Sequence, residues 1–175
     1  MKYKLLWLGV LFFLIPTNSA FSFETITPMD AYKLVADYDN VYILDVRTQA
    51  EWQWVGHPGV NGHDEGAVLE GKVVNIAFKI DCGVVGEKPE LNLDFAEDVI
   101  DTFDSDVILI TMCRSGPRGA AAAKILEGKY KVMNMEGGFE GGLDKRGYRK
   151  VGGWVNKNLP YNYQGWGYQK GTCPK

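Results

Sequence analysis

The sequence predicts an α/β fold in which helices cover both faces of a central parallel sheet. Short apolar runs rich in β-branched residues alternate four times with segments whose apolar residues recur at helical spacing. This alternation is typical of parallel sheets, because a crossover between parallel strands usually carries a helix. The chain has 175 residues, enough for one domain with a sizeable core, and shows no internal repeat.

The first predicted helix begins at Pro28. Thr27 is placed to cap it, and proline suits the first helical position because an amide there would have no partner. Asp30 favours the positive end of the helix dipole. Apolar residues then recur along one face: Ala31, Leu34, Val35 and Tyr38. The run VYILDV, residues 41–46, follows and is expected to form a buried strand.

The next segment contains a capping box, Thr48 to Glu51, which is expected to open a short second helix. The glycine-rich residues 56–72 predict a loop, and VVNIAF, residues 73–78, predicts a second strand. Asn92 is placed to cap a third helix. Its apolar face would contain Ala96, Val99, Ile100 and Phe103.

The second half of the chain continues the alternation. Residues 106–112, DVILITM, have the strongest strand pattern in the sequence. A helix is expected over residues 119–127, with Gly128 placed to end it. The run YKVMNM, residues 130–135, predicts a last strand, which leads into the glycine-rich turn EGGFEGG.

The N-terminus has the features of a secretory signal peptide, which we assign to residues 1–22. Lys2 and Lys4 form a positive start, residues 5–15 are apolar, and the small residues of TNSAFS follow as a cleavage region. The apolar run is short for a membrane span, and an uncleaved anchor is the alternative. The protein is therefore expected to be periplasmic or secreted. A net charge of −3 gives no indication of nucleic-acid binding.

The segment TMCRSGPRGAAAAK, residues 111–124, carries the chemistry. Cys113 lies at the carboxyl end of a predicted strand, where ligands gather in open parallel sheets. The amides of the following helix N-terminus favour an anion, and Arg114 and Arg118 add two positive charges. A thiol in this setting is expected to exist largely as thiolate. The segment therefore predicts a nucleophilic cysteine in an anion-binding cup; the alternative is a buried structural cysteine.

Two chemistries use such a cup, namely hydrolysis of phosphate esters through a cysteinyl phosphate and sulfur transfer through a cysteine persulfide. The spacing between thiol and arginine separates them. Loops of the tyrosine-phosphatase type resemble Cys-x5-Arg and can surround a tetrahedral phosphate, whereas Cys113 and Arg118 form Cys-x4-Arg. The shorter loop has less room for a phosphate and favours binding of the terminal sulfur of a persulfide.

Five segments, in the same order, resemble the rhodanese (thiosulfate sulfurtransferase) domain family. They are ILDVRTQAEW (43–52), GHPG with VVNIAF (56–59 and 73–78), CRSGPRG (113–119), EGGFEG (136–141) and GGWVNKNLPY (152–161). The resemblance implies a single α/β rhodanese-like domain over residues 23–161, followed by an aromatic tail, residues 162–175. Two features depart from the family pattern: the segment between Gly59 and Val73 is longer than usual, and Ala77 stands where proline is common.

The resemblance also implies roles for individual residues. Cys113 would be the catalytic nucleophile, and Asp45 and Arg47 would support the active loop. Substrate binding would fall to the remaining loop residues: Arg114, Ser115, Gly116, Pro117, Arg118 and Gly119. From the residues alone, an ion pair between Arg47 and Glu51, which are spaced as neighbours on a helix, explains Arg47 at least as well as a role in supporting the active loop.

The expected function is sulfur transfer through a persulfide on Cys113. The thiolate would attack the outer sulfur of thiosulfate or a similar small anion, sulfite or a thiol would leave, and cyanide, a thiol or a protein would accept the sulfur. No cofactor is needed, because the persulfide carries the sulfur. One alternative is a sulfur-carrier or redox-binding module without turnover, and a cysteine-dependent phosphatase is the third.

The remaining histidines and cysteines are candidate ligands or bridges. His57 and His63 could bind a metal, but they lack a nearby cysteine or an ordered set of carboxylates, so no metal is assigned. An odd number of cysteines in an exported protein suggests either one bridge and one free thiol or three free thiols. We expect Cys82 and Cys173 to be bridged; otherwise Cys82 becomes a resolving partner for Cys113. Three aromatic residues of the tail are expected to pack against the domain: Tyr163, Trp166 and Tyr168.

Overall fold

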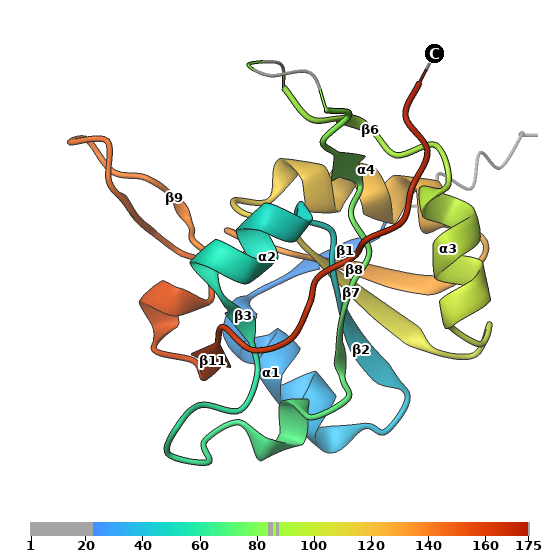
Figure 1. Ribbon diagram of the computed structural model, residues 1–175. Helices are drawn as coiled ribbons and strands as arrows, with labels where there is room; N and C mark the ends of the chain where they lie inside the picture. Colours follow the sequence, from blue (N-terminus) through green and yellow to red (C-terminus); the bar gives the residue numbers. More distant parts are fainter. Residues whose placement is uncertain (1–22, 84–85, 87, 175) are drawn as a thin grey trace, which may run out of the picture.

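A five-stranded parallel sheet forms the centre of the computed structural model, which describes residues 23–83, 86 and 88–174 (Figure 1). The strand order is β1-β8-β7-β2-β4, and every pairing is parallel. The strands are β1 (Glu24–Ile26), β2 (Val41–Asp45), β4 (Val73–Asn75), β7 (Ile108–Met112) and β8 (Lys131–Met135). The predicted signal peptide, residues 1–22, lies outside the described residues.

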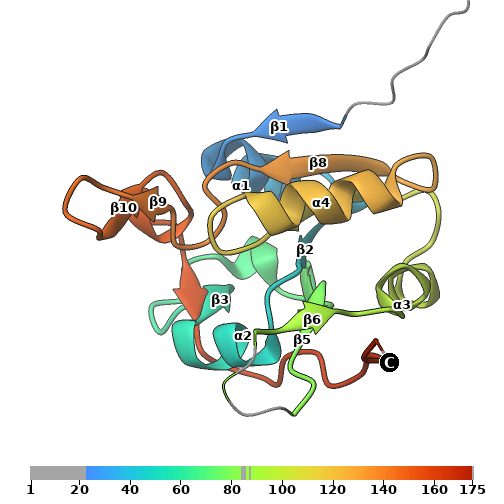
Figure 2. The same ribbon diagram turned by 90° about the horizontal axis from the view of Figure 1, so that it is seen from above.

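Helices cover both faces of this sheet, as predicted. The helix α1 (Pro28–Asp37) and the 3₁₀ helix η1 (Ala67–Leu69) contribute to the core of one face, and α3 (Phe95–Thr102) and α4 (Pro117–Leu126) to the other. Figure 2 shows α1 and α4 on opposite sides of β8. None of the described helices is both long and apolar enough to cross a membrane.

Each face of the sheet has its own buried core because side chains alternate along the strands. In β7, Ile110 and Met112 join the α1 side, whereas Leu109 beside them joins the α4 side. The same alternation places Val41 and Ile43 of β2 on the α1 side. The central strands are therefore buried on both sides, which explains their nearly continuous apolar sequences.

The predicted N-caps of the first two helices are present, and several element boundaries differ from prediction. Thr27 caps α1, and Thr48 forms the reciprocal capping box of α2 (Gln49–Val55). The helix α4 begins at Pro117, two residues before the predicted start at 119, because proline occupies the first helical position. The strand β4 ends at Asn75 rather than at residue 78, because its partner β2 ends at Asp45, directly opposite.

Asn92 does not cap α3, contrary to prediction, and instead connects the core to the C-terminal tail. The helix begins at Phe95, after Asp94. The buried Asn92 amide donates to the carbonyl of Ala77 at 3.1 Å and to the hydroxyl of Tyr168 at 3.0 Å. The position of Asn92 is therefore fixed by contacts with residues that are distant in the sequence.

Short strands and a second 3₁₀ helix surround the carboxyl edge of the sheet. They are β3 (His57–Pro58) paired with β11 (Tyr161–Asn162), β5 (Lys79–Ile80) with β6 (Glu90–Leu91), β9 (Gly142–Leu143) with β10 (Arg149–Val151), and η2 (Val155–Lys157). The loop predicted over residues 56–72 thus contains β3 and η1. The strand β1, which pairs with β8 at the sheet edge, was not predicted.

The tail returns across the domain and is joined to it covalently. Cys173 forms a disulfide with Cys82, with the Cα atoms 5.9 Å apart, so the predicted pairing is confirmed. Tyr168 packs beside the core of the α4 face. Tyr163 is 58% exposed but packs edge-on against Tyr161, with ring centroids 5.9 Å apart. Trp166 is 74% exposed, so the expectation that all three aromatic residues pack against the domain is wrong for Trp166.

Candidate active site

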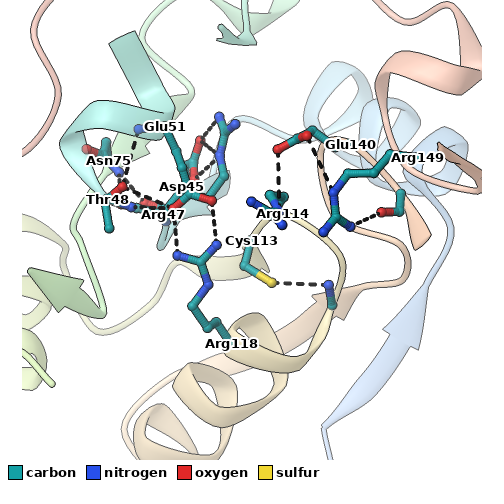
Figure 3. A network of polar contacts seen from close by, with 12 residues as sticks. Asp45, Arg47, Thr48, Glu51, Asn75, Cys113, Arg114, Arg118, Glu140 and Arg149 are labelled. Carbon is teal, nitrogen blue, oxygen red and sulfur yellow. Dashed lines mark hydrogen bonds and ion pairs between the residues drawn. The ribbon is translucent and has the colours of Figure 1, made fainter. Parts of the chain in front are cut away.

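The active loop, residues 113–118, joins the central strand β7 to the start of α4 (Figure 3). Cys113 follows the last residue of β7 and is only 1% exposed. Gly116 has a φ of 117°, which favours glycine. Its amide donates a hydrogen bond to Sγ of Cys113 at 3.1 Å. The loop therefore curls back so that its own backbone contacts the thiol.

The glycine turn at residues 137–138 holds the outer side of this loop. The amide of Phe139 donates to the carbonyl of Cys113 at 2.7 Å, and the amide of Glu140 donates to that of Arg114 at 2.9 Å. Gly138 has a φ of 56°, and a Cβ there would lie 2.1 Å from the Cys113 carbonyl oxygen. The approach of the two segments therefore requires glycine.

These hydrogen bonds also orient the loop amides. In a trans peptide the carbonyl and the following N–H point in opposite directions. With the carbonyls of Cys113 and Arg114 bound to the glycine turn, the amides of Arg114 and Ser115 face away from that turn. The amides of Arg118 and Gly119 lie in the first turn of α4, where no intrahelical acceptor exists. Together these N–H groups suit a small anion.

Arg118 is bound to Glu51, which was not predicted. Its Nη1 and Nη2 donate to the two carboxylate oxygens, each at 2.6 Å. Burial would raise the pKa of Glu51, but the hydrogen bonds and charge of Arg118 hold it below its ordinary value. Burial would likewise lower the pKa of Arg118, but Glu51 and the neighbouring Cys113 raise it. The pair ties the capping box of α2 to the first turn of α4.

Arg47 pairs with Asp45, so the alternative expectation of an Arg47–Glu51 pair is wrong. Both partners are fully buried, with Nη2 of Arg47 2.6 Å from Oδ2 of Asp45. Nη2 also donates to the carbonyl of Gly56 at 2.7 Å, and the guanidinium carbon lies 4.2 Å from the centre of the Phe139 ring. The backbone amide of Phe139 donates to the Cys113 carbonyl. The Arg47–Asp45 pair therefore supports the active loop through its contact with Phe139.

A cavity of about 380 Å³ opens beside the loop. It is lined by Thr48, Glu51, Lys79, Lys88, Pro89, Arg114 and Arg118. Two predicted substrate-binding residues, Arg114 and Arg118, therefore face the same cavity. The Arg114 side chain is 44% exposed, and its Nε lies 3.7 Å from Oε1 of Glu140. Ser115, Gly116, Pro117 and Gly119 do not line the cavity. Ser115, Gly116 and Gly119 have backbone N–H groups that can face an anion, whereas Pro117 has none.

Lys79 and Lys88 were not among the predicted site residues. They come from the arm formed by β5 and β6, which lies outside the family segments recognised in the sequence. A lysine in a short irregular segment has no local signal that places it near a cysteine elsewhere in the chain. Only the position of the arm, which is bridged to the tail by the disulfide, brings both lysines to the cavity.

The two histidines do not come together. His57 is buried and stacks on Trp52, with ring centroids 3.6 Å apart, and its Nε2 lies 2.6 Å from the carbonyl oxygen of Gln164. His63 is exposed in a turn. Within residues 23–83, 86 and 88–174, no group of three histidine, cysteine or acidic side chains could hold a metal ion. His57 thus has a structural role, fixing the start of the tail against α2.

Comparison with known proteins agrees with the observed fold. Residues 27–145 match the family model of the Rhodanese-like domain. An uncharacterized protein of Rickettsia conorii is 28% identical over 146 residues, covering 81% of this chain and 99% of the relative. An uncharacterized protein of Rickettsia prowazekii is 26% identical over 144 residues, covering 80% and 98%.

Solved structures share the architecture. The crystal structure of Rv0390 from M. tuberculosis is similar with a TM-score of 0.67 and 30% identity, over 82% of this chain and 100% of that chain. The solution structure of a polysulfide-sulfur transferase homodimer from Wolinella succinogenes is similar with a TM-score of 0.50 and 22% identity, over 80% and 78%. The second likeness is one of fold alone.

Proposed function

The chain belongs to the rhodanese-like domain family, and we propose that it is a sulfurtransferase which carries sulfur as a persulfide on Cys113. The observation that carries this proposal is the six-residue loop around the thiol. Its glycine amide donates to Sγ at 3.1 Å, and its arginines line the cavity beside it. A nucleophilic sulfur surrounded by N–H donors is suited to hold a negatively charged persulfide.

The first half-reaction loads the cysteine. The Cys113 thiolate attacks the outer sulfur of thiosulfate, forming a new S–S bond at Sγ. The S–S bond of thiosulfate breaks, and its electron pair leaves with sulfite. Arg114, whose side chain is 44% exposed, is placed to attract the dianion, while the loop amides stabilise the persulfide that remains.

The second half-reaction returns the enzyme to its starting state. A thiolate or cyanide attacks the outer sulfur of the persulfide, the bond between that sulfur and Sγ breaks, and its electron pair restores the Cys113 thiolate. No proton needs to move in either step with anionic reactants. Alternation between free and sulfur-loaded enzyme gives ping-pong kinetics.

We propose that this chemistry takes place in the periplasm or outside the cell. The sequence of residues 1–22 supports export. The Cys82–Cys173 disulfide supports it independently, because such bridges persist in oxidising compartments. With that bridge formed, Cys113 is the free cysteine of the described residues, so intramolecular disulfide exchange with a free partner does not compete with loading.

The test measures thiocyanate formed from thiosulfate and cyanide by purified protein. We expect turnover by the wild type and none by Cys113→Ser, whose circular dichroism should be unchanged. Full activity in the serine variant would overturn the mechanism. Loading of Cys113 without turnover by any small acceptor would instead favour the carrier alternative, and hydrolysis of an aryl phosphate would favour the phosphatase.

A further inference from the structure

The cavity beside the active loop carries more positive charge than a single small anion needs. Among the described residues that line it, four are cationic and one is acidic. Both oxygens of that one carboxylate, Glu51, are already bound by Arg118. The net charge of the whole chain is −3, so a basic cavity is a local departure from an acidic protein. Of the remaining cations, Arg114 lies 3.7 Å from Oε1 of Glu140, which leaves Lys79 and Lys88.

The two lysines belong to a different segment of the chain from the active loop. Lys79 lies on β5, and Lys88 lies in the segment that leads into β6. Among the described residues, neither forms an ion pair. The arm that carries them is fixed to the tail by the Cys82–Cys173 disulfide. Both lysines therefore line the cavity without an ion-pair partner among the described residues.

We propose that Lys79 and Lys88 bind a second anionic group of the sulfur donor, several bonds from the sulfur that is transferred. This inference rests on the proposed sulfurtransferase function and names its substrate class: an organic sulfane-sulfur compound that bears a carboxylate or similar group. In thiosulfate all charge sits beside the transferred sulfur, within reach of the loop. Lysine acts as a mobile point charge, so this wall selects for charge more than for shape.

A matched pair of donors isolates the effect of the second anionic group. Benzenethiosulfonate and its para-carboxylated derivative have the same reacting end. With either donor the Cys113 thiolate forms a bond to the outer sulfur, the S–S bond of the donor breaks, and its electron pair leaves with the arenesulfinate. Any difference in kcat/KM between the two donors therefore reports on recognition of the distant carboxylate.

We expect the wild type to prefer the carboxylated donor by roughly three- to tenfold in kcat/KM, a range that one or two partly exposed charge pairs can supply. The preference should weaken at high salt. In Lys79→Gln/Lys88→Gln the ratio should fall to about one. The control Lys124→Gln/Lys129→Gln removes two exposed charges at the opposite end of α4 and should keep the wild-type ratio.

Two results would overturn the inference: equal use of both donors by the wild type, or an unchanged preference in Lys79→Gln/Lys88→Gln. Either would leave the sulfurtransferase function standing, because both donors would still transfer sulfur. If neither donor nor thiosulfate transfers sulfur to the wild type, the proposed function fails and the inference fails with it. Turnover of benzenethiosulfonate by the double variant shows that its active loop is folded.

Discussion

The guanidinium of Arg118 binds both carboxylate oxygens of Glu51, each at 2.6 Å, while the same carboxylate closes the capping box of α2. This pair fixes the helix that follows the active loop to the helix that follows β2. It also gives the two arginines of the loop different roles. Arg118 is held by Glu51 and orients the loop, whereas Arg114 has the more exposed side chain, 44% against 25%.

Glu51→Gln should destabilise the protein in a pH-dependent way. Arg118 lowers the pKa of Glu51 in the folded state, so its stabilisation is present above the unfolded value of about 4.3 and is lost as pH falls through the folded value. We expect a loss of about 1–3 kcal/mol in unfolding free energy at neutral pH, shrinking below about pH 4. Urea unfolding across this range measures it, with the exposed Glu70→Gln as control. A difference that is constant with pH would contradict the role of the ion pair.

Replacing the two arginines should have separable effects. Arg118→Ala should lower unfolding free energy as Glu51→Gln does and reduce kcat/KM for thiosulfate at least about tenfold, the worth of one charged hydrogen bond. Arg114→Ala should reduce kcat/KM with little change in stability, because its side chain is exposed. Steady-state kinetics and urea unfolding of both variants test this. An unchanged efficiency in Arg118→Ala would show that the loop does not need its anchor.

Gly138→Ala should disrupt the site far more than a comparable change elsewhere. A Cβ at Gly138 would meet the Cys113 carbonyl oxygen at 2.1 Å. Gly128 also has a positive φ, 80°, but a Cβ there would meet nothing within 4 Å, so Gly128→Ala carries only the backbone cost of about 1–2 kcal/mol. We expect Gly138→Ala to lose most sulfur transfer and more stability than the control. Equal unfolding free energies and activities in the two variants would refute the close approach.

The sheet and its covering helices could be predicted because their signals are local. Apolar runs mark β2 and β7, and caps such as Thr27 and the Thr48 box mark helix starts. The edge strand β1 could not be predicted in this way, because it has only three residues and is a strand only through its pairing with β8. The end of β4 likewise depends on where its neighbour β2 ends.

The six-residue loop could also be predicted from sequence, since Cys113, Gly116 and Pro117 lie within one short segment. The ion pairs and the basic residues around this loop could not be predicted from sequence. The Arg47–Asp45 pair forms across two residues at the end of a buried strand, where helical spacing misled the prediction. The Glu51–Arg118 pair and the basic wall join segments that are distant along the chain, and charge patterns in sequence do not encode such contacts.

Removal of the disulfide should loosen the tail without releasing the core. The bridged cysteines are 91 residues apart, and closing a loop this long gives an upper bound of roughly 4–5 kcal/mol. We expect a loss of about 2–4 kcal/mol in Cys82→Ser/Cys173→Ser, since Thr172 keeps hydrogen bonds to Asn92 and Asp94. Denaturant unfolding measures the loss. Thiol titration of unreduced, denatured wild type should find one reactive group; three would exclude the bridge in the isolated protein.

A persulfide on Cys113 can be detected by the intact mass of the protein before and after incubation with thiosulfate. We expect a gain equal to one sulfur atom in the wild type and no gain in Cys113→Ser. Treatment with cyanide should remove the added mass as one equivalent of thiocyanate appears. An unchanged mass in the folded wild type, or an equal gain in Cys113→Ser, would contradict a persulfide on Cys113.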